Sequence, residues 1–295
     1  MVSVKKKIVG KQEYYYLEHS IREGNRVIKK EKYLGKIIPK NIDELKKEFI
    51  YASLREKWFS LFNKIKDNYI IENKKMPLIA KEKFIQDFSV KFTYNSQKIE
   101  GSTLTLKETA NLLLRGIAPN KPINDIKEAE SHKKIFLDML DYKKELTLAK
   151  ILEWHKELMI NTKPEIAGKI RNYQVVIGGS KFIPPSATIV KTLLTNFIVW
   201  FNNNKIKIHP VELAGLVHLK FVTIHPFADG NGRISRILMN FVLSENNYPL
   251  LNIKYDNRNS YYSSLEKAQV KDEELTFIKW FFKEYFNQNK KDLKL

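Results

Sequence analysis

The sequence predicts a mainly all-α protein that carries a short antiparallel β appendage at its N-terminus. After residue 41, apolar residues recur every three or four positions, which is the period of an amphipathic helix. Before it, residues 4–40 alternate short β-prone runs around the turn Glu23-Gly24-Asn25. We therefore expect a small sheet at residues 1–40, followed by a helical bundle that fills most of the chain.

The helical part begins at Ile42-Asp43-Glu44-Leu45, where acidic residues stand in the first turn. The pattern then predicts helices over roughly 79–99, 105–115, 124–144, 147–160, 190–203, 209–224, 232–246 and 260–287. Residues 173–185 break this rhythm, because β-branched residues flank Gly178-Gly179 and Pro184-Pro185 ends the run. This pattern indicates a β-hairpin.

The composition excludes several classes of site. The 295 residues include no cysteine, so the chain has no disulfide, thiolate zinc site or thiol nucleophile. No apolar run approaches the ~18 residues of a membrane span, and no apolar segment follows the basic residues near Met1. We expect a cytoplasmic protein without a membrane partner.

The net charge of +19 admits two interpretations. Clustered lysine and arginine favour nucleic acid, because they release counterions from a phosphate backbone. Lysine is nevertheless spread along the whole chain and no nucleic-acid module is apparent, so a solvated basic surface is the favoured explanation of the charge. Anionic partners, including nucleotides, are favoured by both.

The residues that carry chemistry lie between two predicted helices, in the segment 225–236. Pro226 ends the preceding helix at His225. The apolar spacing of Ile234, Ile237 and Leu238 starts a second helix near Gly232. The sequence thus predicts a glycine-containing loop at a helix N-terminus, which is a suitable site for a polyphosphate.

Charged and titratable residues complete this site. Arg233 and Arg236 add positive charge, and Asp229 beside phosphates is a suitable ligand for Mg²⁺. His225 can take a proton near neutral pH. Three other interpretations fail. A hairpin at Asn231-Gly232 conflicts with the helical period that follows, a calcium loop lacks its later oxygen ligands, and the histidine spacing matches no usual zinc site.

The segment His225 to Arg236 resembles the signature of the Fic family, H-P-F-x-[D/E]-G-N-G-R-x-x-R, at every fixed position. Residues 177–185 resemble the family's flap, and 258–266 its helix beside the adenine. The resemblance spans roughly 90–287. Residues 1–40 lie outside it, and we expect there a small β appendage of unknown role. We expect an N-terminal helical region with the inhibitory helix over 41–104, a Fic catalytic core over 105–288 and a charged tail over 289–295.

The resemblance implies a protein adenylyltransferase, which moves AMP from ATP to a Ser, Thr or Tyr hydroxyl of a target protein. His225 would be the base, Asp229 would hold Mg²⁺ or Mn²⁺, and the phosphates would be bound by Gly230, Asn231, Gly232, Arg233 and Arg236. Tyr262 and Gln269 would lie beside the adenine. Gln269 stands where the family often has Asn, which leaves UMP or another nucleotide open. The flap residues expected to dock the target are Gly178, Gly179, Ser180, Lys181 and Phe182.

A second segment, Ser96 to Gly101, resembles the family's inhibitory motif, [S/T]-x-x-x-E-[G/N]. Gly101 is typical of the residue that follows a helix, so Glu100 stands at the helix's negative end, where a carboxylate is disfavoured. The resemblance implies that Glu100 pairs with Arg236 and obstructs the γ-phosphate, with Ser96 in the same motif.

Two alternative functions remain open. The chain could instead be a hydrolase that removes AMP from a modified protein, with Glu100 orienting the water. It could also be a nucleic-acid-associated regulator whose residues 1–40 contact DNA or RNA. The target protein cannot be identified from the sequence, and a homo-oligomer could control the helix that carries Glu100.

Overall fold

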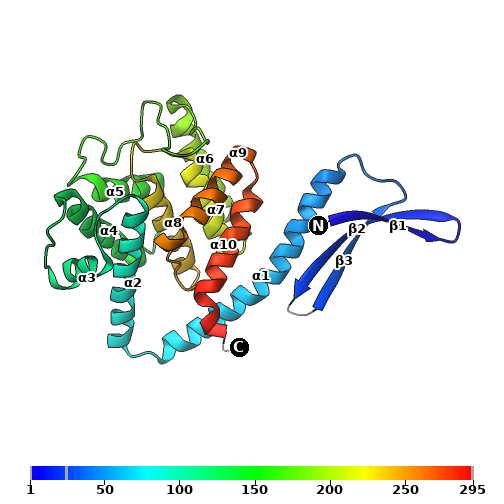
Figure 1. Cartoon of the computed structure of the whole chain (residues 1–295), viewed down its shortest axis with the longest axis horizontal. Coiled ribbons are helices and arrows are strands. Elements are labelled where there is room, and N and C mark those ends of the chain that lie inside the picture. Colours follow the sequence, from blue (N-terminus) through cyan, green and yellow to red (C-terminus); the bar gives the residue numbers. More distant parts are fainter. Residues whose placement is uncertain (1, 24–25, 294–295) are drawn as a thin grey trace. The chain divides into compact units, whose positions relative to one another are not determined.

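The computed structural model describes residues 2–23 and 26–293 (Figure 1). The chain divides into two compact units, one ending at Asn63 and the other beginning at Lys64. The division falls inside the long helix α1 (Ile42–Lys75). No helix among residues 2–23 and 26–293 is long and apolar enough to cross a membrane.

The first unit contains the predicted sheet. Strands β1 (Val2–Val9), β2 (Gln12–Glu23) and β3 (Arg26–Gly35) pair antiparallel in the order β1-β2-β3. Leu17 of β2 is fully buried on the face that α1 covers. On this face Lys32 pairs with Glu48 at 3.8 Å and the ring of His19 lies 6.5 Å from that of Phe49. The sequence prediction of a small N-terminal sheet is confirmed.

The second unit is a helical bundle, as predicted. Its helices are α2 (Leu78–Ile99), α3 (Leu106–Arg115), α4 (Ile123–Asp141), α5 (Leu148–Met159), α6 (Ala187–Asn204), α7 (Pro210–Ile224), α8 (Asn231–Glu245), α9 (Arg258–Lys271) and α10 (Glu274–Asn289). Short 3₁₀ helices cover Tyr255–Asn257 and Lys290–Leu293. The predicted tail at 289–295 is therefore helical as far as residue 293.

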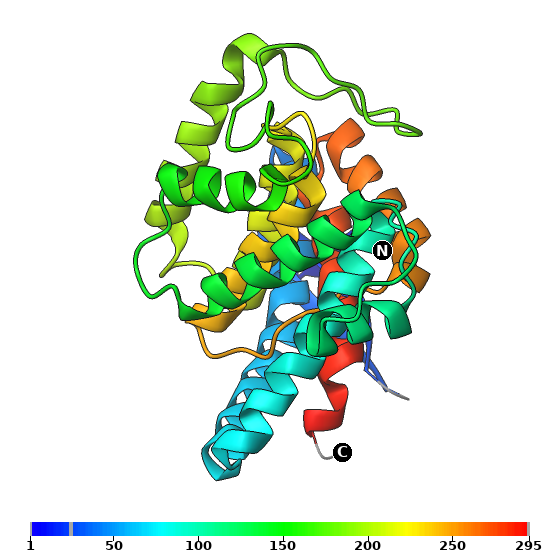
Figure 2. The same cartoon turned by 90° about the vertical axis from the view of Figure 1, so that its left-hand side faces the viewer.

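Helices α7 and α8 form the centre of the bundle and pack on each other, with α4 and α10 against them (Figures 1 and 2). Nearly every residue of α7 and α8 is buried, including polar ones such as His218 and Asn240. The loop between these two helices, residues 225–230, is therefore anchored on both sides by the most buried part of the fold.

Two predictions about elements are wrong. The helix predicted over 260–287 is interrupted at Asp272, whose φ of 49° is left-handed, so α9 and α10 are separate helices. The segment 173–185 contains one turn, from Ser180 N–H to the carbonyl of Ile177 at 3.1 Å, but no strand. Proline at 184 and 185 removes two donors that a ladder needs, and the side chain of Gln174 bonds the carbonyl of Pro184 instead. Figure 2 shows this segment (green) as an extended loop that projects from the bundle.

Candidate active site

His225 lies at the end of α7 in a left-handed conformation, with φ 51°. Its backbone N–H still bonds the carbonyl of Phe221, and Pro226 prevents a further helical turn. The ring Nδ1 lies 3.2 Å from the carbonyl oxygen of Val222, which can only accept a hydrogen bond. Nδ1 therefore carries the proton, and the lone pair of Nε2 is free to act as a base.

Burial lowers the pKa of His225 below its ordinary value, and the positive charge of Arg171 adds to this. The hydrogen bond to Val222 and the carboxylates of Glu100 and Asp229 act in the opposite direction without reversing the shift. His225 is consequently neutral near pH 7, which is the state that a general base requires.

The loop after His225 is held by Phe227 and Asn231. Phe227 is fully buried and its ring stacks on that of His155 at 3.6 Å between centroids. The side chain of Asn231 accepts from the Phe227 N–H at 2.9 Å and donates to the Phe227 carbonyl at 2.8 Å. Because the oxygen and the nitrogen of this amide both bond to the backbone of Phe227, Asn231 fixes the loop through its side chain.

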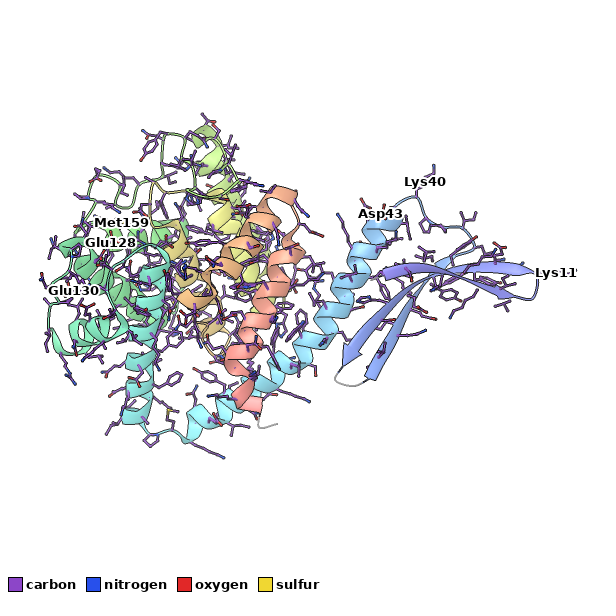
Figure 3. The ribbon with its side chains drawn as sticks, viewed as in Figure 1. Lys11, Lys40, Asp43, Glu128, Glu130 and Met159 are labelled. Atoms are coloured by element: carbon purple, nitrogen blue, oxygen red, sulfur yellow. The ribbon has the colours of Figure 1, made fainter. Side chains whose placement is uncertain are left out.

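Helix α5 also holds this loop, through its residue His155. His155 accepts from the N–H of Gly168 at Nδ1, so its Nε2 donates to the carbonyl of Asp229, each at 3.0 Å. Gly230 has φ 80°, and a Cβ there would collide with Met159. Figure 3 shows Met159 close to Glu128 in this part of the bundle. Only glycine satisfies both the backbone conformation and the close approach of α5 at position 230.

The N-terminus of α8 offers backbone N–H groups to an anion. The first hydrogen bond of the helix runs from Ile234 N–H to the carbonyl of Gly230. The N–H groups of residues 231, 232 and 233 consequently have no carbonyl partner within the helix. Together with the helix dipole, these groups favour a phosphate, as the sequence predicted.

Asp229 is surrounded by positive charge. Its Oδ2 contacts the ammonium of Lys163, and its Oδ1 accepts from Arg233 at 3.0 Å and from the N–H of Gly230. Burial alone would raise the pKa of Asp229, but Arg233 and Lys163 outweigh it and lower the pKa to about 2. Asp229 is therefore ionised at any physiological pH.

The residues present fit a magnesium ion delivered with a nucleotide. Mg²⁺ commonly takes one or two carboxylates together with phosphate oxygens and water. Asp229 is one such carboxylate, and its side chain is 35% exposed. Within the described ranges 2–23 and 26–293, no cluster of three or more His, Asp or Glu side chains could hold a metal without the nucleotide.

Arg233, which the resemblance assigns to the phosphates, bonds to other protein groups in this structure. Its side chain is 2% exposed and is bonded to Glu128 of α4, to Asp229 and, at 3.3 Å, to Gln97 of α2. These carboxylates raise its pKa against the effect of burial. In this conformation Arg233 joins α2, α4 and α8, and its role as a phosphate ligand stays a prediction.

Arg236 meets Glu100, as the family resemblance implied. The guanidinium, 1% exposed, donates to the Glu100 carboxylate at 2.7 Å and to the hydroxyl and carbonyl of Ser96 at 2.9 and 3.1 Å. It also lies 3.5 Å from the hydroxyl of Tyr261. Residues separated by more than one hundred positions thus form one polar cluster, in which Arg236 and Ser96 are buried and the Glu100 side chain is 27% exposed.

Glu100 also covers the start of α8. A Cβ built on Gly232 would lie closer to the Glu100 carboxylate than real side chains allow. The carboxylate therefore stands directly on the helix N-terminus that is suited to a phosphate. The hydroxyl of Tyr262 bonds the carbonyl of Ile99 at 3.0 Å and fixes the end of α2 beside it.

A cavity of about 510 Å³ joins these groups. The cavity is lined by His225, Gly232, Arg236 and Glu100. Both residues predicted beside the adenine, Tyr262 and Gln269, also line it. Of the five predicted flap residues, Gly178, Gly179 and Ser180 line it. Lys181 and Phe182 do not line it. The backbone N–H of Lys181 donates to the Glu266 carboxylate of α9 at 3.2 Å, so the flap also contacts a residue of α9 that lines the cavity.

Arg171 connects the flap to His225. Its side chain, in a residue that is only 4% exposed, donates to the carbonyls of His225, Tyr173 and Pro185 at 2.8, 2.9 and 2.6 Å. The two ends of the flap and the position of the base therefore depend on one guanidinium.

Sequence reasoning did not identify Arg171, His155, Glu128 or Lys163. His155 and Lys163 lie 74 and 66 positions from their partner Asp229, and Glu128 lies 105 positions from its partner Arg233. None of the four residues belongs to a recognisable motif. The only local signal was that Arg171 stands immediately before the segment predicted as the flap.

Comparison with known proteins supports this site. Residues 145–243 match the model of the Fic/DOC family. The protein adenylyltransferase Fic of Drosophila erecta is 39% identical over 184 residues, which cover 61% of this chain and 37% of that protein. The protein adenylyltransferase fic-1 of Caenorhabditis elegans is 34% identical over 188 residues, with the same coverage. The chain thus spans well under half the length of these curated relatives.

A solved structure shows the same fold. A Fic-domain-containing signaling protein from Bacteroides thetaiotaomicron superposes with a TM-score of 0.69 and 28% identity, over 78% of this chain and 96% of that one. The similarity therefore extends well beyond the 99 residues that the family model matches.

Proposed function

We propose that this chain, whose residues 145–243 match the Fic/DOC family, is a protein adenylyltransferase that transfers AMP from ATP to a hydroxyl of another protein, and that Glu100 restrains it. The observation that carries the proposal is the cavity in which His225, the N-terminus of α8 and the Glu100–Arg236 pair lie together. Its nucleobase and target remain to be determined by experiment.

His225 supplies the base. Its free Nε2 takes the proton of the target hydroxyl, while the oxygen forms a bond to the α-phosphorus of ATP and the bond from that phosphorus to the β-phosphate oxygen breaks. Pyrophosphate leaves with the electron pair. Such transfers depend on positioning and charge stabilisation, which the fixed tautomer of His225 and its anchored loop provide.

The phosphates would be bound at the start of α8. The free N–H groups of residues 231–233 and the guanidinium of Arg236 supply donors and positive charge there. Asp229 would hold Mg²⁺, which neutralises phosphate charge as the leaving group departs. Tyr262 and Gln269 line the same cavity and are suitable to contact the nucleobase.

The position of Glu100 supports the proposed restraint. Its carboxylate occupies the α8 N-terminus above Gly232 and neutralises Arg236. A terminal phosphate would meet like charge there and would lose the Arg236 contact. ATP would then bind in a displaced pose, in which the α-phosphate is not aligned with the attacking oxygen.

The flap is suited to a target segment. Val176 and Ile183 are 82% and 74% exposed on either side of its turn, and no strand pairs with either arm. A target chain could add to one arm through main-chain hydrogen bonds, beside the cavity that holds His225.

Removal of AMP from a modified protein is a second candidate, because Glu100 and His225 line the same cavity. In that reaction the Glu100 carboxylate orients a water and takes its proton, while the water oxygen bonds to the phosphorus and the bond from that phosphorus to the protein oxygen breaks. The protein oxygen takes a proton from the protonated form of His225, and AMP is released. The two candidates make opposite predictions for Glu100→Gly, which should accelerate transfer but abolish removal.

The test compares the wild type with Glu100→Gly and His225→Ala, each incubated with α-labelled ATP and Mg²⁺ and then with a cell lysate. Strong label on the protein or on lysate proteins with Glu100→Gly, little with the wild type and none with His225→Ala supports transfer and restraint. Equal label with His225→Ala would contradict the role of the base. If no variant labels, loss of AMP from a modified target tests the second candidate, and UTP, GTP and CTP test the nucleobase.

A further inference from the structure

One face of the N-terminal sheet gathers tyrosine and lysine side chains. The register pairs Lys5 with Tyr16, Lys7 with Tyr14, and Tyr16 with Tyr33, so these five residues point to the same side. Leu17, which faces α1, points to the opposite side. We call the side that carries the tyrosines the tyrosine face.

The charge of this part of the chain is strongly positive. Residues 1–40 include eleven Lys or Arg against four Glu, a net charge of +7 out of +19 for the whole chain. The positive charge is therefore concentrated in the sheet unit, contrary to the even distribution that the composition suggested.

Some lysines on or beside the tyrosine face form ion pairs within the sheet, and others are available to a partner. Lys7 pairs with Glu31 at 2.5 Å and Lys29 approaches Glu18 at 3.9 Å. By contrast, three exposed lysines form no ion pair with any residue in the described part of the chain: Lys5, Lys11 and Lys36. Figure 3 shows Lys11 at the tip of the β1–β2 turn.

The tyrosines form a compact group. The ring centroid of Tyr33, which is 53% exposed, lies 5.2 Å from that of Tyr16 and 6.2 Å from that of Tyr14. The ammonium groups of Lys7 and Lys36 lie 4.6 and 5.9 Å from two of these ring centroids. Aromatic rings beside lysines on an open sheet suit a polymer that alternates flat bases with phosphates.

We propose that the tyrosine face binds nucleic acid, with the lysines on the phosphate backbone and the tyrosines against bases or sugars. An acidic peptide would satisfy the lysines but offers no flat group for three tyrosine rings. The proposal does not depend on adenylyl transfer, and binding would localise the catalytic unit on nucleic-acid-associated targets.

The test uses the full chain and two variants that change charge equally. The first combines Lys5→Glu, Lys11→Glu and Lys36→Glu on the sheet unit. The matched control combines Lys207→Glu, Lys279→Glu and Lys283→Glu, three exposed lysines of the helical bundle. Fluorescence anisotropy measures Kd for duplex DNA, single-stranded DNA and single-stranded RNA at about 0.05, 0.1 and 0.2 M salt. Thermal melting checks that both variants fold.

We expect wild-type binding to weaken steeply with salt. The sheet variant should bind on the order of tenfold or more weakly and should show a shallower slope of log Kd against log salt, because fewer phosphates are contacted. The bundle control should keep most of the affinity. Tyr33→Leu should weaken single-strand binding on the order of fivefold, because a base loses its stacking partner.

Three results would overturn the proposal: no binding to any of the three nucleic acids at the lowest salt, an equal loss in the bundle control, or equal competition by polyglutamate. The relative affinities for duplex and single strands identify which form is bound. The anisotropy measurements of Kd do not depend on adenylyl transfer, so failure of the proposed enzymatic function would leave their results unchanged.

Discussion

The hydroxyl of Tyr262 donates a hydrogen bond to the carbonyl oxygen of Ile99 at 3.0 Å, and so ties α9 to the residue that precedes Glu100. This bond fixes the end of α2 without touching the Glu100 carboxylate. Its removal should loosen the Glu100–Arg236 pair while it leaves both charged groups in place.

We predict that Tyr262→Phe raises basal AMP transfer roughly two- to tenfold, the range expected for one intramolecular hydrogen bond. The phenyl ring keeps the contact surface that the base would use. The effect should be absent in a Glu100→Gly background, because no restraint remains to be loosened. A double-mutant cycle on the rate of target labelling measures this, and an equal effect in both backgrounds would place Tyr262 in nucleotide binding instead.

Much of the site was predictable because it is local in the sequence. The segment 225–236 contains the base, the loop and the helix N-terminus within twelve residues, and helical periodicity on either side fixed its context. The Glu100–Arg236 contact followed from a resemblance rather than from geometry, since nothing local brings α2 to α8.

The remaining site residues and element boundaries depend on tertiary contacts, which a local sequence pattern does not indicate. Glu128 and Lys163 meet Arg233 and Asp229 only after α4 and α5 pack around α8. The break at Asp272 was missed because aspartate seldom ends a helix in the left-handed region, where glycine or asparagine is usual. The prediction of a β-hairpin in the flap was wrong because a Gly-Gly pair indicates where a chain reverses but not whether the two arms can pair.

The second prediction concerns Arg171. Arg171→Met keeps an unbranched stem but removes three hydrogen bonds, those to the carbonyls of His225, Tyr173 and Pro185. We expect kcat to fall on the order of tenfold or more as His225 loses its fixed position, and KM for the target to rise as the flap loosens. Steady-state labelling in the Glu100→Gly background separates the two parameters.

The control for Arg171→Met is ATP binding, which should change little because Arg171 does not line the cavity. Calorimetry with a non-hydrolysable ATP analogue measures it. Unchanged kcat and KM in a folded variant would show that the flap and the base do not depend on this guanidinium.

The third prediction concerns Lys163, whose ammonium contacts the Asp229 carboxylate that is suited to Mg²⁺. Lys163→Met should tighten divalent metal binding up to about fivefold, because an ion pair of partly exposed groups is worth roughly 0.2–1 kcal/mol. Titration of Mn²⁺ followed by electron paramagnetic resonance, with the ATP analogue present, measures the affinity directly. Lys156→Met, on an exposed lysine of the adjacent α5, is the matched control. Weaker metal binding in Lys163→Met would instead show that Lys163 helps to hold the nucleotide's phosphates.

The last prediction concerns pH and His225. The base must be neutral, and burial lowers its pKa from the ordinary value of 6.5. The neutral fraction therefore persists to lower pH than for a free histidine, so activity should fall at a lower pH than a free histidine would give, as the pH drops through the lowered pKa. In the Glu100→Gly background the fall should begin at still lower pH, because the Glu100 carboxylate raises the pKa of His225. The pH profile of kcat/KM for labelling, with circular dichroism to exclude acid unfolding, measures the midpoint. The NMR titration of the His225 ring, assigned by its loss in His225→Ala, must give the same midpoint. A different midpoint would contradict the role of His225 as the base, and a shared midpoint above 6.5 would contradict the lowering of its pKa by burial.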